Sequence, residues 1–235
     1  MLESVVPDLA SGPACTSHVE LRNLGAQTVE VSLEGHVDGG ALVPLEGQRG
    51  LAVRLAPGQQ STFGFGSGQG TGGGWVKVRE PLSPESDAAS VAISGAVECT
   101  ENDVLKTVFR PVAFALRNPW FEGDTASFPG AELLIVNTEP HPASARACYS
   151  AGSFYSVPRG RGGAGEWQPV CSAVWETQLA PFASARVPLE HPGDTHFSLR
   201  TRGGAIVLQI LRPLDGSTRL FTVDSTIHFE QEVHP

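Results

Sequence analysis

Lysine is almost absent from this chain of 235 residues, since only Lys77 and Lys106 carry it, and acidic side chains outnumber basic ones to give a formal net charge of −9. Proteins that bind nucleic acid present clustered basic side chains to the phosphates. The densest basic segment here, RGRGG at 159–163, is short and rich in glycine, as is typical of a flexible loop tip. We therefore predict that nucleic acid is not a partner.

Long hydrophobic runs are also missing. No stretch approaches the roughly 18 consecutive apolar residues of a membrane-spanning helix, so we expect no membrane span. Residues 1–18 lack the basic region and the apolar core of a signal peptide. If the protein works outside the cytoplasm, its leader is therefore not among these residues.

Helix signals are scarce as well. No segment of 12 or more residues keeps an apolar face at a period of 3.6 without Gly or Pro, whereas alternation at period 2 is frequent. The chain has 27 Gly and 18 Pro, which suits many short strands joined by turns. The clearest alternating segments are VELRNL (19–24), TVEVSLEG (28–35), LAVRLA (51–56), WVKVRE (75–80) and HFSLRTR (196–202). We predict an all-β fold.

The two halves of the chain share an order of motifs. LAPGQQSTFGF (55–65) and LAPFASARVPL (179–189) open alike, and each follows a strand that ends in an asparagine, Asn23 or Asn137. This order predicts an internal duplication, with two tandem β-sandwich domains at 10–114 and 119–235, joined within 110–120. The second contains about ten extra residues, in an insert near 151–170 rich in Gly, Arg and aromatic residues. The alternative is that two unrelated sandwiches share these common features.

The segments VELRNLGAQTVEVSLEG and LAPGQQSTFGF resemble the immunoglobulin-like modules of bacterial extracytoplasmic proteins. An Asn-terminated strand and a turn of the form L-x-P-G-x-x-x-x-F recur in that family. The resemblance covers about 50 residues of the first half and is weaker in the second, where Phe182 replaces Gly58. It implies an immunoglobulin-like fold and an adhesive, structural or accessory role.

Four cysteines divide evenly between the halves, at Cys15, Cys99, Cys148 and Cys171. They form no CxxC motif, which argues against a zinc ribbon or a thioredoxin-like site. We predict a Cys148–Cys171 disulfide that closes the insert. Cys15–Cys99 is a weaker prediction, because in an immunoglobulin topology their strands run in the same direction and the two residues would lie at opposite ends. Disulfides would indicate a periplasmic or secreted protein; four reduced, buried cysteines and a cytoplasmic location remain the alternative.

No catalytic or cofactor motif is convincing. The GxGxxG match at Gly68, Gly70 and Gly73 precedes a strand rather than the helix that a dinucleotide site needs, so no cofactor is expected. A G-x-S-x-G nucleophile elbow is absent. EHPGDTH contains polar side chains that a metal would accept, with His141 as a third ligand from elsewhere, but the segment also reads as an ordinary turn, and we predict no metal. The side chains concerned are Glu190, His191, Asp194 and His196.

The insert is the predicted ligand site. Tyr155, Arg159, Arg161 and Trp167 combine aromatic rings and guanidinium groups, which dominate binding hot spots, with a glycine-rich backbone. We therefore predict a non-catalytic extracytoplasmic binding, adhesive or structural module, whose partner is a protein or a carbohydrate. The alternatives are a carbohydrate-binding module that uses the aromatic residues of the second domain, and a hydrolase or metal-dependent enzyme.

Overall fold

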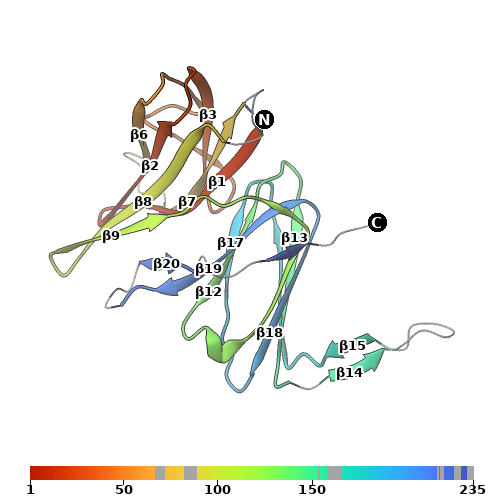
Figure 1. Ribbon diagram of the computed structural model, residues 1–235. Helices are drawn as coiled ribbons and strands as arrows, with labels where there is room; N and C mark the ends of the chain where they lie inside the picture. Colours follow the sequence, from red (N-terminus) through yellow and green to blue (C-terminus); the bar gives the residue numbers. More distant parts are fainter. Residues whose placement is uncertain are drawn as a thin grey trace.

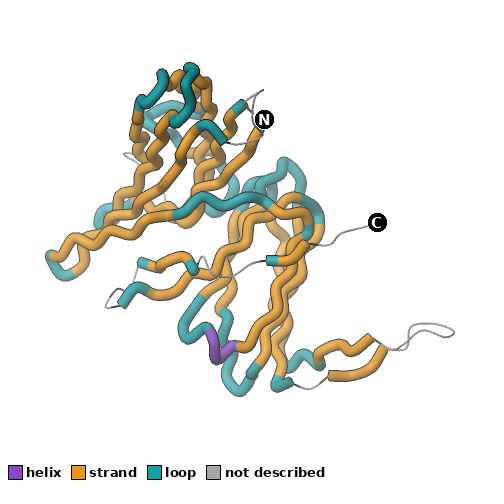
Figure 2. The backbone as a smooth tube through the Cα atoms, in the orientation of Figure 1, coloured by secondary structure: helices purple, strands orange, loops and turns teal. Residues whose placement is uncertain are grey.

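The structure is a computed structural model that describes residues 1–66, 72–81, 89–152, 154–157, 166–215, 217, 220–224 and 229–231. Strands account for most of these ranges, and their only helical element is a short 3-10 turn, η1 (Thr125–Ser127) (Figure 2). Neighbouring strands pair antiparallel in several sheets. The predicted all-β class is confirmed. Over the same ranges no helix is long and apolar enough to cross a membrane.

The first half of the chain forms two sheets that face each other across an apolar core (Figure 1). One sheet has the order β1 (Leu2–Ser11), β7 (Gly72–Glu80) and β3 (Val29–Val37), with β4 (Leu42–Val43) and β5 (Leu51–Leu55) both paired to β3. The other has the order β6 (Gln60–Phe65), β2 (Cys15–Asn23), β8 (Val91–Glu101) and β9 (Val104–Arg110). The alternating apolar residues of these strands, such as Val19 and Leu21, fill the core.

The second half repeats this arrangement of two sheets around its own apolar core. One sheet has the order β16 (Ala173–Leu179), β13 (Ala143–Ser150), β18 (His196–Arg202), β11 (Pro119–Asp124) and β21 (Glu230–Gln231). The other has the order β10 (Leu116–Arg117), β19 (Ala205–Pro213), β12 (Glu132–Asn137) and β17 (Ser184–Pro188), with β20 (Phe221–Val223) beside β19. A separate hairpin of β14 (Phe154–Val157) and β15 (Glu166–Pro169) joins β13 to β16.

The strand order of the first half recurs in the second. The order β1-β7-β3-β5 corresponds to β11-β18-β13-β16, and β6-β2-β8-β9 corresponds to β17-β12-β19-β20. Strand β1 (Leu2–Ser11) lies mostly before position 10, where the sequence-based boundary placed the start of the first unit. Strand β1 has the same place beside β7 that β11 has beside β18.

The two asparagines at the ends of β2 and β12 have the same role. The Asn23 side chain donates to the carbonyls of Gln27 and Leu55 and accepts from the amide of Gly25. In the second half, Asn137 donates to the carbonyls of His141 and Ala180 and accepts from the amide of Glu139. Each asparagine thus ties its own turn to the LAP turn. The strands that enter these turns are therefore held in the same way in both halves.

Two strands of the second half are buried on both faces. Leu133 and Ile135 of β12 point into the core of the second half, whereas Leu134 and Val136 pack on the first half beside Val5 and other residues. Along β19 too, residues that point into the core of the second half alternate with residues that pack on the first half. A strand buried on both faces needs a nearly continuous apolar run, which explains the segments AELLIVN and AIVLQIL. The outer faces of β1-β7 and β12-β19 thus form the junction between the halves.

A buried carboxylate lies in this junction. Strand β1 contains a β-bulge between Val6 and Leu9, and within it Asp8 has a φ of 55°, in the left-handed region. Bulges re-aim side chains. Here the Asp8 carboxylate meets Arg110 of the first half at 2.5 Å and also contacts Arg186 of β17. Burial raises the pKa of Asp8, and the two guanidinium groups lower it.

Stacked rings and a buried lysine also connect the two halves at the junction. The ring of His36 is stacked between Trp75, at 4.5 Å, and Phe182 of the second half, at 4.8 Å. Trp75 Nε1 donates to the Phe182 carbonyl, and Lys77 Nζ donates to the Thr138 carbonyl at 2.6 Å. Phe182 has a φ of 59°, a strained value for a bulky residue, whereas the corresponding Gly58 adopts a φ of 73° without strain. The residue at this position of the second LAP turn thus packs on the first half.

The expected direction of the strands that carry Cys15 and Cys99 is corrected. Strand β8 pairs directly with β2 and runs antiparallel to it, so the two cysteines are register partners, and they form a disulfide with a Cα–Cα distance of 4.1 Å. The immunoglobulin order would place these strands apart. The predicted Cys148–Cys171 disulfide is also present.

The two disulfides should stabilise the fold unequally. Cys15–Cys99 spans a sequence separation of 84 and Cys148–Cys171 one of 23. The chain-entropy relation then gives about 4.6 and about 3.4 kcal/mol of stabilisation. We expect Cys15→Ala with Cys99→Ala to lower the unfolding free energy by about 1 kcal/mol more than Cys148→Ala with Cys171→Ala. Urea unfolding of both double variants checks this, and a larger loss for the second pair would contradict it.

Stability should fall below neutral pH because of His36. Burial lowers the pKa of this histidine below its ordinary value of 6.5, against the raising effects of the Gly40 carbonyl and Glu34, while Lys77 and Arg79 lower it further. Between these two pKa values the unfolded chain binds a proton that the folded chain does not. The contribution of His36 to the unfolding free energy therefore decreases as the pH falls below about 6.5, by at most about 1.4 kcal/mol per pH unit for one proton.

His36→Phe keeps a planar ring between Trp75 and Phe182 but cannot be protonated. We expect this variant to lose most of the pH slope between about pH 5 and pH 7 in denaturant unfolding, where histidines titrate. His141→Gln, at an exposed position, is the matched control and should keep the slope. An unchanged slope in His36→Phe would show that another group is responsible.

Candidate functional site

The predicted insert contains the β14–β15 hairpin. Its register pairs Tyr155 with Gln168 and Ser156 with Trp167. In Figure 1 this hairpin extends away from the end of the second half, beyond β13 and β18. Arg159 and Arg161 lie outside the described residues, so the structure places only two of the four predicted site residues, both on strands of the hairpin.

The base of the insert is anchored to the sheet. Cys148, near the end of β13, is bonded to Cys171, which lies just before β16. Beside the disulfide, the amide of Ser172 donates to the carbonyl of Tyr149 at 2.8 Å. Tyr149, which precedes the insert, is a core residue whose hydroxyl donates to the Pro188 carbonyl, and burial raises its pKa to about 12. It is therefore not available to stack on a ligand.

The EHPGDTH segment forms a turn at the same end of the second half. His191 Nδ1 lies 2.6 Å from Asp194 Oδ2, and the hydroxyl of Ser172 donates to Asp194 Oδ1. The carboxylate therefore lies between the serine and the histidine. In a hydrolytic triad the histidine must lie between them, so that it can take the proton from the serine. This arrangement holds the turn in place but does not activate Ser172.

The metal-binding alternative finds no geometric support in this turn. His196 lies within β18, where its register partners are Asp124 of β11 and Ser150 of β13. Across the part of the chain that the structure describes, no three His, Cys, Asp or Glu side chains gather in a way that could hold a metal ion.

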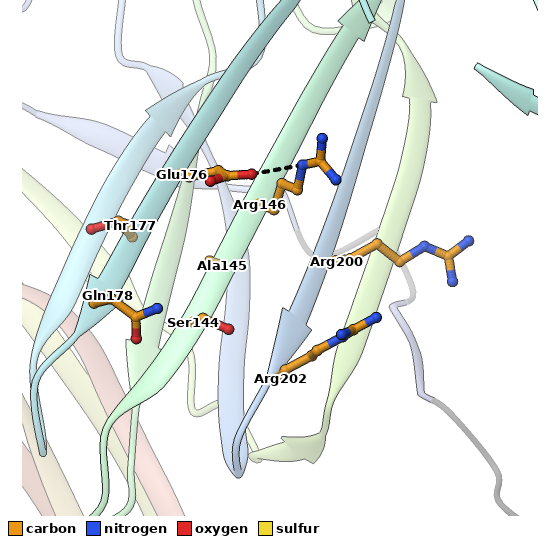
Figure 3. Close-up of a pocket in the computed structure, with 8 residues that line it drawn as sticks. All are labelled: Ser144, Ala145, Arg146, Glu176, Thr177, Gln178, Arg200 and Arg202. Carbon is orange, nitrogen blue, oxygen red and sulfur yellow. Dashed lines mark ion pairs between the residues drawn. The ribbon is translucent and has the colours of Figure 1, made fainter. Parts of the chain in front are cut away.

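A hollow on the outer face of the second half brings together residues that the sequence did not single out. It lies on the sheet of β16, β13 and β18, on the side away from the core (Figure 3). Its volume of about 440 Å³ lies in the range of ligand pockets, roughly 300–1,000 Å³. We call it the arginine groove and define it by Ser144, Arg146, Glu176, Gln178, Arg200 and Arg202.

Two arginines lie directly opposite each other in the groove. Arg146 of β13 and Arg200 of β18 are register partners on neighbouring strands. Like charges in directly opposed positions of an antiparallel pair are destabilising. Arg202 extends the positive charge along β18 from the next outward-facing position, opposite Ser144. Figure 3 shows the three guanidinium groups on these two strands.

The groove neutralises this charge only in part. Arg146 Nε pairs with Glu176 at 2.8 Å, but both side chains are more than half exposed, so the pair is weak. The Arg200 guanidinium lies over the ring of Trp120 and 3.5 Å from Glu122. No ion pair involves Arg202 within the described residues. A protein of net charge −9 thus presents a local excess of positive charge on one sheet face.

Part of the signal for this groove was in the sequence. In ASARACYS and HFSLRTR the arginines alternate with buried residues such as Ala145 and Thr201, which places them on the outer face. The pairing of β13 with β18 brings Arg146 against Arg200, and that pairing depends on strand order. Sequence periodicity alone does not give this order.

No family model, curated protein or solved structure matches this chain. The candidate site is therefore defined by its own geometry.

Proposed function

We propose that the protein is a non-catalytic binding module, working outside the cytoplasm, that holds an anionic ligand in the arginine groove. The observation that carries the proposal is the direct opposition of Arg146 and Arg200 on neighbouring strands. Like charges in such positions repel each other, and here each side chain turns to the strand on its far side, Arg146 to Glu176 and Arg200 to Glu122. A carboxylate, sulfate or phosphate group bound over β13 and β18 would accept charge-assisted hydrogen bonds from both arginines and offset their repulsion.

We propose further that the two halves are tandem units from an internal duplication, near 10–114 and 119–235, with β1 added to the first. The recurring strand order and the matching bonds of Asn23 and Asn137 support this. The relation to immunoglobulin-like modules rests on the β2–β6 and β3–β7 pairs, which that fold also has. The order differs in that β1 pairs with β7 and β8 pairs with β2.

The location outside the cytoplasm rests on the two disulfides. Disulfides persist in oxidising compartments and are rare in reducing ones. Cys15–Cys99 lies within the first half and Cys148–Cys171 within the second, so each unit would be crosslinked on its own.

Binding of a carboxylate-bearing monosaccharide tests the groove. We expect galacturonate at millimolar concentration to shift the NMR signals of Arg200 and Arg202, whereas neutral galactose should not. Arg200→Gln should abolish the shifts but change the unfolding free energy by less than about 1 kcal/mol, because exposed charge contacts are weak.

Arg54→Gln is the matched control, because Arg54 is an exposed arginine that pairs with Glu30 on the first half. This variant should bind galacturonate as the unmodified protein does. Equal shifts with galactose, or shifts spread over all exposed arginines, would contradict the anion site.

A carbohydrate-binding module that uses the insert is the second candidate. The observation in its favour is that the β14–β15 hairpin, which carries Tyr155 and Trp167, extends away from the sheets (Figure 1). Aromatic rings that bind sugars must be reachable from solvent.

Tyr155→Ala with Trp167→Ala separates this candidate from the groove. If the insert is the site, the double variant should lose capture on a glycan array while its melting temperature stays within a few degrees. Normal capture would place the site elsewhere, and loss of folding would show that these residues belong to a core.

A further inference from the structure

We propose that the ligand of the arginine groove is a linear acidic polysaccharide that continues from the groove into a second hollow beside the segment that links the two halves. This inference rests on the proposed function and extends it from a single anionic group to a polymer. The second hollow has a volume of about 590 Å³. We call it the linker pocket and define it by Arg117, Asn118, Glu139, His141, Gly203 and Gly204.

The two hollows adjoin along two neighbouring strands. Strand β18 ends at Arg202 in the groove, and the next residue, Gly203, lines the linker pocket. Strand β13 begins between Ser144, in the groove, and His141, in the linker pocket. Because β13 and β18 pair side by side, both connections lie at the same end of the sheet. An extended ligand can therefore occupy both hollows without crossing another strand.

A turn of two glycines, which have no side chains, lies between the two hollows. Gly203 and Gly204 have φ values of 100° and 153°, which L side chains rarely adopt. A side chain at Gly203 would also approach the Pro142 carbonyl to 3.1 Å. The Asn118 carbonyl oxygen Oδ1 accepts from both glycine amides and holds the turn against β10. The turn thus has no side chain that would block a polymer.

Four arginine side chains lie one after another along this path. Arg146 and Arg200 lie in the groove, Arg202 follows at the end of β18, and Arg117 lies beyond the glycine turn, opposite Ala205. Neither Arg117 nor Arg202 takes part in an ion pair within the described residues. Two unpaired guanidinium groups therefore flank the turn, one in each hollow.

The side chains between the cations indicate the class of polymer. Ser144 and Gln178 in the groove and the Asn118 amide nitrogen in the linker pocket offer hydrogen bonds to hydroxyl groups. Glu176 and Glu139 lower the positive charge along the path. This alternation suits a chain of uronic acids, in which carboxylates are separated by hydroxyls. It does not suit duplex DNA, which has a negative charge about every 1.7 Å of its axis.

Titration calorimetry with galacturonate and its oligomers tests the inference. We expect the affinity of the unmodified protein to rise with oligomer length and to fall as salt is added. Arg117→Gln should weaken the binding of a long oligomer by about fivefold, the upper range for one exposed charge contact. The same variant should bind the monosaccharide as before, because Arg117 lies outside the groove. Arg54→Gln is again the control.

The outcomes separate the two proposals. If length has no effect, or if Arg117→Gln weakens monosaccharide and oligomer alike, the polymer path is overturned while the anion site stands. If neither ligand binds, both proposals fail. Polyglutamate or duplex DNA binding as tightly as the oligouronate would overturn the polysaccharide class. A melting temperature of Arg117→Gln equal to that of the control variant confirms that any loss reflects binding.

Discussion

The buried carboxylate of Asp8 ties the two halves together, because it contacts Arg110 of the first half and Arg186 of the second. Because dehydrating charged groups is costly, such a cluster contributes little net stability, but removal of one partner costs about 3–5 kcal/mol. We therefore expect the cluster to act mainly through specificity, because an alignment of the halves that separates these groups would leave a buried charge without its partner. It depends in turn on the bulge in β1, since an unbroken strand would direct this side chain elsewhere.

That alignment decides which surfaces remain free for binding. The junction covers the outer faces of β1-β7 and β12-β19, so β12 and β19 have no solvent-facing side over most of their length. The outer face of β13, β16 and β18 lies on the opposite side of the second half and stays exposed. The arginine groove can therefore tolerate opposed charges that a buried sheet face would not. The junction and the arginine groove thus lie on different sheets of the same unit.

The sequence predicts the class of fold and several local features, because these depend on neighbours along the chain. Alternation marks the strands, and the spacing of Cys148 and Cys171 suggests their bond. The partner of Cys15 is harder to predict, because it requires β8 to lie beside β2 and not on the other sheet. The same holds for the groove, which exists because β13 pairs with β18. The apolar run AELLIVN did carry a sign of burial on both faces, which alternation alone hides.

Heat should affect the junction and the cores differently. The cost of dehydrating charged groups falls as temperature rises, because their hydration entropy is strongly negative, whereas the contribution of apolar burial levels off. The contact of Asp8 with its two arginines, together with the buried Lys77, therefore becomes relatively more favourable on warming. The charged contacts across the junction therefore gain on the apolar contacts beside them, such as those of Leu134 and Val207, as the temperature increases.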